Sequence, residues 1–194
     1  MRTVATLAVV VVLGACSKST DRSVAGVWAK HTLADGRLSF EMPGPAEHER
    51  TAKQQGPDTL DEERAACDND DRHYSVSVTA GKALAKRMGT TEKEHVRWAG
   101  FHIVGIVQGE EERSIVDEGK WTQGPLVGKW MQLALPEKPP QRKLPVYRWL
   151  YAAAWEGKAV LVGFSATQAA YDDDVDGPAV EQARERFVAS VTVE

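Results

Sequence analysis

The sequence predicts an α+β domain in which a central antiparallel β-sheet is flanked by helices. Residues 38–42 alternate apolar and polar side chains, with the two-residue period of a half-buried strand. Residues 146–167 form two long apolar and aromatic segments around Glu156-Gly157, which is typical of a hairpin because glycine supplies the positive φ of a tight turn. Apolar residues then recur at helical intervals over 91–109 and 178–191, which indicates two helices.

The other expected elements are all strands. An exposed edge strand is expected at 46–55, where the chain is polar throughout. Further strands are expected at 59–67, 73–79, 114–121 and 130–135. Thr91 and Glu94 have the spacing of a capping box at the start of the first helix, and Pro178 suits the first turn of the second.

The amino terminus has the pattern of an export signal. One positive charge at Arg2 is followed by an apolar run over 4–12, which is too short to span a bilayer. The run ends at Leu13-Gly14-Ala15-Cys16, which resembles the lipobox of bacterial lipoproteins. The alternative is an ordinary secretion signal that contains a cysteine by chance.

The lipobox resemblance implies that Cys16 is acylated and becomes the first residue of the mature protein. Several acyl chains make a durable anchor, since each buried methylene contributes about 0.8 kcal/mol. We therefore expect a signal peptide at 1–15, a lipidated cysteine and tether at 16–32, and a folded domain at 33–194. Ser17 stands where aspartate often retains lipoproteins in the inner membrane, so a periplasm-facing position on the outer membrane is favoured.

Charge and cysteine content narrow the possible functions. The net charge is −4 and the basic residues are dispersed, so a nucleic-acid partner is not expected. The chain has two cysteines, and acylation of Cys16 leaves Cys67 without a partner. Cys67 is either a reactive thiol or a small buried apolar residue. Burial is the more common state of such a cysteine, and we expect it here.

The order of elements also resembles a known fold. The opening strand Asp-Gly-Arg-Leu-Ser-Phe-Glu-Met-Pro-Gly-Pro (35–45), the long aromatic hairpin and the final helix into Phe-Val-Ala-Ser-Val (187–191) are similar to the PsbP-like family, named for the extrinsic photosystem II protein. The resemblance spans about 33–193 and implies an α/β/α sandwich. It carries no site residue to this chain, and fold analogy is a weak guide to function.

One stretch resembles a metal loop. Asp172, Asp174 and Asp176, followed by Gly177, match the first half of a calcium loop. Ala183 then stands where a bidentate glutamate is needed. An acidic run before a helix is the simpler interpretation, since the positive end of the helix dipole favours it. No metal and no cofactor is therefore expected.

Three other patterns are weak candidates for metal binding or catalysis. His95 and His102 lie two helical turns apart, which is too far for both to bind one ion directly. His73 follows an acidic turn and could join Asp70 or Asp71. The segment Gly163-Phe-Ser-Ala-Thr167 lacks the closing glycine of a nucleophile elbow. We therefore expect no enzyme activity.

Tyr147, Trp149 and Tyr151 fall on one face of a predicted strand and are the favoured candidates for an exposed partner surface. The sequence as a whole predicts a non-enzymatic, lipid-anchored periplasmic protein that binds or assembles an envelope protein partner. The alternative is a carrier or sensor that encloses a small apolar ligand. An aromatic cavity would support this alternative, and a solid core would exclude it.

Overall fold

The computed structural model describes residues 27–55, 58–69, 72–108, 114–134, 145–167 and 177–194. Within these ranges the chain forms ten strands in two antiparallel sheets, with three helices. No helix in these ranges is both long enough and apolar enough to cross a bilayer.

The smaller sheet has the order β1-β2-β10 and the larger sheet the order β3-β4-β5-β9-β8-β7-β6. The strands of the smaller sheet are β1 Trp28–Leu33, β2 Leu38–Pro43 and β10 Thr192–Val193. The strands of the larger sheet are β3 Glu47–Gln55, β4 Asp58–Asn69, β5 Arg72–Ala80, β6 Ser114–Gln123, β7 Leu126–Ala134, β8 Pro145–Trp155 and β9 Lys158–Thr167. The helices are α1 Lys82–Met88, α2 Glu92–Val107 and α4 Gly177–Ser190.

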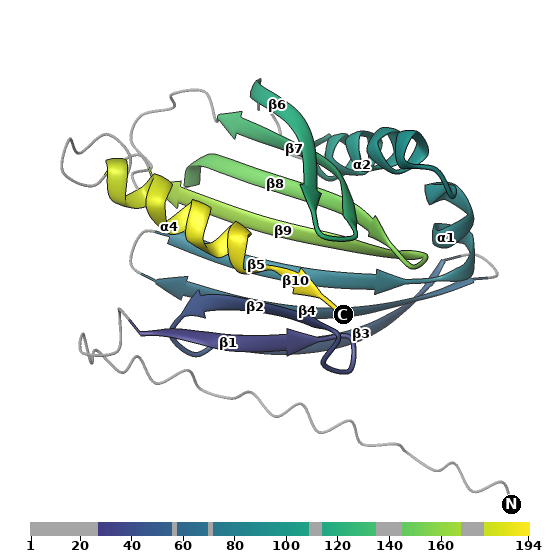
Figure 1. Cartoon of the computed structure of the whole chain (residues 1–194), viewed down its shortest axis with the longest axis horizontal. Helices are drawn as coiled ribbons and strands as arrows, with labels where there is room; N and C mark the ends of the chain where they lie inside the picture. The colour runs from purple at the N-terminus through teal and green to yellow at the C-terminus, as the bar shows by residue number, and fades with distance from the viewer. Residues whose placement is uncertain (1–26, 56–57, 70–71, 109–113, 135–144, 168–176) are drawn as a thin grey trace, which may run out of the picture.

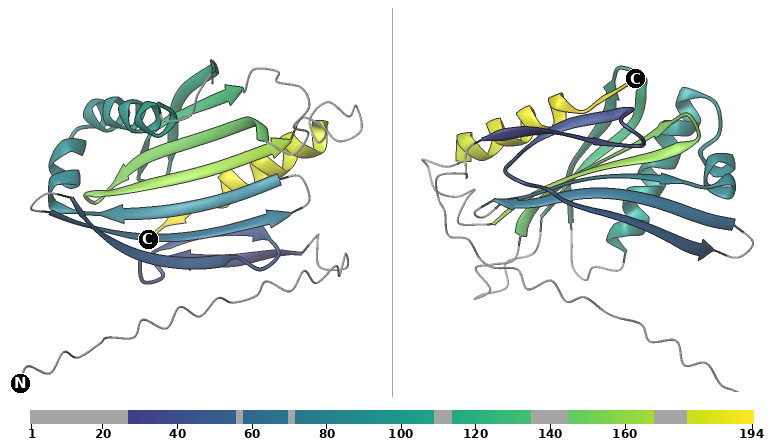
Figure 2. Two further views of the ribbon diagram at one scale, coloured as in Figure 1. Left: turned by 180° about the vertical axis from the view of Figure 1, so that it is seen from behind. Right: turned by 90° about the horizontal axis from the view of Figure 1, so that it is seen from below.

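The two faces of the larger sheet have different covers. The smaller sheet and α4 lie against one face, and α1 and α2 lie against the other (Figures 1 and 2). On the first face a cluster of buried aromatic rings joins the layers. Tyr74 on β5 makes edge contacts with Phe164 on β9 and Phe187 on α4, at ring centroid distances of 5.1 and 5.2 Å.

The second face is only partly covered. The apolar side of α2, with Trp98, Ala99 and Ile103, packs on Met131 of β7 and Leu150 of β8. α2 reaches mainly β7 and β8, and α1 contacts β4 at its start, where the Ala83 N–H donates to Asp58. The rest of the β3-β4-β5 side of this face is left without a helical cover. This asymmetry positions the candidate site.

Most of the expected elements are confirmed. The hairpin turn has φ of 47° at Glu156 and 73° at Gly157, and the capping box at Thr91 is formed in both directions. β3 is an edge strand that is exposed along almost its whole length. β1 begins inside the segment predicted to be tether, and α1 and β10 were not expected.

The predicted fold class is wrong. The described chain is mainly β, and the larger sheet is not sandwiched between helices, because its core face is covered by a second sheet and one helix. The cause is long-range pairing: Leu38 on β2 pairs with Leu33 of β1 and with Val193 of β10. Local periodicity does not report such partners, because it describes one segment at a time.

Candidate functional site

A polar row crosses the partly covered face of the larger sheet. On β4, Arg64, Ala66 and Asp68 alternate with Ala65 and Cys67, which are buried in the core. Because directly opposed residues of antiparallel strands share a face, the register continues this polar face across the sheet. The paired residues, in order, are Asp68 on β4, His73 on β5, Ser165 on β9 and Arg148 on β8.

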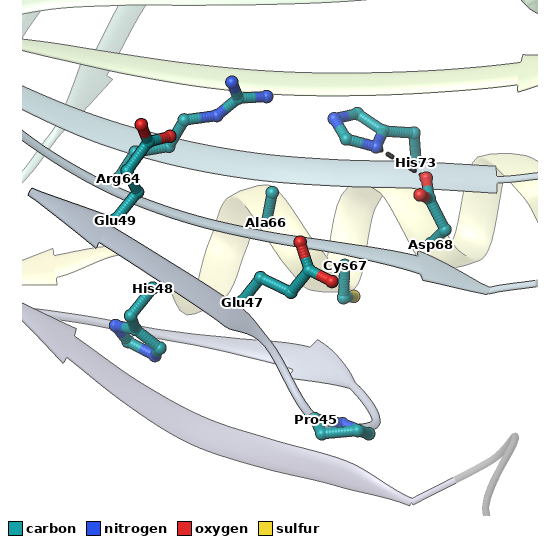
Figure 3. Close-up of a pocket in the computed structure, with 9 residues that line it drawn as sticks. All are labelled: Pro45, Glu47, His48, Glu49, Arg64, Ala66, Cys67, Asp68 and His73. Carbon is teal, nitrogen blue, oxygen red and sulfur yellow. Dashed lines mark hydrogen bonds and ion pairs between the residues drawn. The ribbon is translucent and has the colours of Figure 1, made fainter. Parts of the chain in front are cut away.

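The face is hollowed by two adjoining cavities of about 560 Å³ and 330 Å³. Both are lined by Arg64, Asp68 and His73, so they form one depression, which we call the polar cleft. The larger cavity extends over β3 (Figure 3). The smaller extends toward β8. The remaining lining side chains that bear polar groups are Glu47, His48, Glu49, Cys67, Ser75, Arg148 and Ser165.

One hydrogen bond organises the floor of the polar cleft. His73 Nδ1 lies 2.7 Å from Asp68 Oδ1, across the β4–β5 pair (Figure 3). The histidine therefore joins Asp68 within the strand pair, and Asp70 and Asp71 lie outside the described residues.

Aspartate, histidine and serine in one row are the residue types of a hydrolytic triad, which requires a hydrogen bond from the serine to the imidazole. Among the described residues Ser165 makes no such bond, and only 6% of its surface is exposed. The row therefore lacks the geometry of an activated nucleophile.

Arg64 is the cation of the polar cleft that has no partner among the described residues. Its guanidinium extends across β5, away from the carboxylate of Glu49 on the neighbouring strand (Figure 3). An arginine placed in this way offers a planar set of N–H donors to a ligand in the cleft.

Cys67 lies beneath the cleft and is buried, as expected, with 6% of its surface exposed. Its Sγ lies 3.3 Å from the carbonyl oxygen of Pro43, to which the thiol donates. Burial, and secondarily the charge of Asp68, raise the pKa of the thiol to about 12. A thiol with this pKa stays protonated and is a poor nucleophile.

The predicted aromatic partner surface is wrong. Tyr147, Trp149 and Tyr151 share one face of β8, but this face is turned to the core. Trp149 is 1% exposed and Tyr151 is 5% exposed, while Tyr147 is half-buried. α4 lies over this part of the strand, and its Arg184 donates a hydrogen bond to the Tyr151 hydroxyl.

The histidines of α2 have structural contacts. His102 stacks on Trp98 at 4.8 Å between ring centroids, and burial lowers its pKa. His95 Nε2 lies 3.3 Å from the carbonyl oxygen of Gly89. Within the described ranges no three histidine, cysteine or acidic side chains are grouped as metal ligands. Cys16, Asp172, Asp174 and Asp176 lie outside these ranges.

The polar cleft does not have the character expected of an apolar carrier site. Its lining is largely ionic or hydroxylic, and the aromatic side chains between the sheets are packed against one another. The sequence had singled out His73, Cys67 and the segment 163–167 among its lining residues, and none of them as part of a binding site. The alternation of polar residues along each separate strand could have indicated the polar faces. The register that brings these faces together could not be obtained from the sequence.

Comparison with known proteins supports the fold. The chain resembles the solution structure of cyanobacterial PsbP (CyanoP) from Synechocystis sp. PCC 6803, with a TM-score of 0.55 and 13% sequence identity, over 94% of this chain and 99% of that one. The chain thus has a PsbP-like fold. A Pseudomonas aeruginosa protein of unknown function superposes with a TM-score of only 0.36, at 9% identity, over 84% of this chain and 96% of that one. No protein-family model and no curated protein matches the chain.

Proposed function

We propose that the chain is a lipid-anchored protein of the bacterial envelope that binds a partner through the polar cleft. The observation that carries the binding role is the cleft itself, a hollow ionic surface on the sheet face that α2 leaves open. The lipobox residues Leu13–Cys16 support the anchor, and Ser17 supports the outer membrane.

The proposed role is binding or assembly without catalysis. It is supported by the absence of a serine–histidine hydrogen bond among the described residues and by the protonated state of Cys67. A PsbP-like fold is compatible with this role, but fold alone does not specify a partner.

The anchor is tested by labelling cells with radioactive palmitate and separating their membranes by density. We expect label on the wild-type protein in the outer-membrane fraction, and we expect Cys16→Ser to lose the label and enter the soluble fraction. A wild-type protein that is unlabelled and soluble would exclude the anchor.

The cleft is tested by placing a photoreactive amino acid at Glu49, an exposed position at its edge. The matched control places the same group at Arg97, an exposed position of α2. Irradiation of intact cells should give a discrete cross-linked species from position 49 and none from position 97. Equal yields from both positions, or none from either, would contradict the proposal.

A further inference from the structure

We propose that the smaller cavity of the polar cleft is a binding site for a phosphate-type oxyanion, held by Arg64 and Arg148. The inference rests on the proposed role of the cleft as a binding surface and specifies the chemistry of its ligand. The two arginines come from β4 and β8, on either side of β5 and β9, and both line the cavity of about 330 Å³.

The floor of this cavity is open and carries hydroxyl groups. Gly163 on β9 has no side chain, and a Cβ built at this position would lie 2.7 Å from Ser75 Oγ on β5. Any other residue at 163 would therefore crowd the Ser75 hydroxyl. Ser165 lies two positions along the same strand and also lines the cavity. The floor thus presents hydroxyl donors between the two arginines.

The local charge favours an anion. Arg64 has no ion pair or hydrogen bond with any described residue, so its charge is available to a ligand. Asp68 is the acidic residue that lines this cavity, and His73 already occupies one of its oxygens at 2.7 Å. Glu47 and Glu49 line the other cavity, over β3. The smaller cavity is therefore lined by two arginines and a single carboxylate.

The donor set suits phosphate better than carboxylate. Each guanidinium can hold two oxygens side by side. Two guanidinium groups and the serine hydroxyls offer more donors than the two oxygens of a planar carboxylate can use, whereas a phosphate group presents oxygens in several directions. The phosphate could belong to a soluble ester or to the headgroup of a phospholipid, and the experiment separates these two sources.

Binding is measured calorimetrically with the purified full chain carrying Cys16→Ser, titrated with inorganic phosphate, glycerol 3-phosphate and acetate at constant ionic strength. We expect saturable binding of the two phosphates and at least tenfold weaker binding of acetate. Arg64→Gln should weaken phosphate binding at least tenfold, and Arg97→Gln should leave it unchanged. Arg148→Lys, which keeps the charge and loses the planar donors, should weaken it by a smaller factor.

The lipid arm uses sedimentation with phosphatidylcholine vesicles, with and without phosphatidic acid. Binding to the phosphatidic acid vesicles that Arg64→Gln abolishes would identify a headgroup ligand, and binding of soluble phosphates alone would identify a soluble one. Absence of saturable binding in both arms, equal affinity for acetate, or insensitivity to Arg64→Gln would overturn the inference. If phosphate binding failed but the photoreactive group at position 49 still gave a cross-link, the phosphate site would be excluded and the proposed partner-binding role would not. The two proposals can therefore fail independently.

Discussion

The guanidinium carbon of Arg184 on α4 lies 5.3 Å from the ring centroid of Trp149 on β8. The same guanidinium donates a hydrogen bond of 2.9 Å to the Tyr151 hydroxyl and pairs with Glu181 one turn earlier on the helix. These contacts fix α4 over the aromatic face of β8, and burial raises the pKa of Tyr151. The aromatic side chains of Trp149 and Tyr151 therefore hold the last helix in place.

We predict that Tyr151→Phe lowers the free energy of unfolding by about 1–2 kcal/mol, because a largely buried arginine loses a hydrogen-bond acceptor. Chemical denaturation measures the change. A double-mutant cycle with Arg184→Met provides the control, since the effect of Tyr151→Phe should largely disappear once the arginine is gone. Strict additivity of the two substitutions would show that the residues are not coupled.

Gly128 on β7 marks a close approach of two strands. A Cβ built there would lie 1.8 Å from the backbone oxygen of Ala152 on β8. We expect Gly128→Ala to destabilise the protein by about 3 kcal/mol, since the backbones must separate. Gly105→Ala on α2 is the control: apart from its chain neighbours and the nearby helix backbone, a Cβ built there would have no atom within 4 Å, and alanine should stabilise the helix by roughly 1 kcal/mol. Similar melting temperatures for the two variants would refute this account.

The Cys67 thiol should resist modification in the folded protein. Its pKa of about 12, against a reference value of 9.0, lowers the thiolate population about 1000-fold at mildly alkaline pH. In the Cys16→Ser chain Cys67 is the sole thiol, and we expect Ellman's reagent to react with it only after guanidinium chloride is added. Rapid reaction of the native protein would mean that the thiol is accessible and ionised.

The capping box should make stability depend on acid pH. Glu94 accepts hydrogen bonds from the backbone of Thr90 and Thr91, which lowers its pKa from 4.5 to about 2. A depressed pKa stabilises the folded state above the unfolded value, and this contribution is lost as pH falls from about 4.5 to about 2. Wild type should therefore exceed Glu94→Gln in stability at neutral pH, and denaturation curves of the two should converge in that window.

The cap is tested separately at Thr91. We expect Thr91→Ala to lower the free energy of unfolding by about 1 kcal/mol, because the hydroxyl no longer accepts from the backbone N–H of Glu94. Lys93→Ala, at an exposed position in the first turn of α2, is a control that should change stability little, because lysine and alanine are both good helix formers. A capping effect no larger than that of the control would contradict the role of Thr91.

Local signals in the sequence were sufficient for most elements and insufficient for their assembly. Glu156-Gly157 predicted the β8–β9 turn because its positive φ values are a local requirement. Most of β1 was predicted to be tether, because Lys30, His31 and Thr32 make the segment polar. It becomes a strand by pairing with β2, which the local sequence does not indicate. The polar cleft depends on the register of β4, β5, β9 and β8, and a shift of one residue in any pairing would turn its side chains into the core.

β3 is an edge strand of the larger sheet, and it carries the charged residues Glu47, Glu49, Arg50 and Lys53. An open sheet edge can recruit a strand of another molecule, and charged residues oppose this. Anchoring would confine copies of the protein to a plane, where encounters are frequent. In such a layer the charged residues of β3 would oppose edge-to-edge pairing between neighbouring copies. The molecules would then remain separate even when crowded.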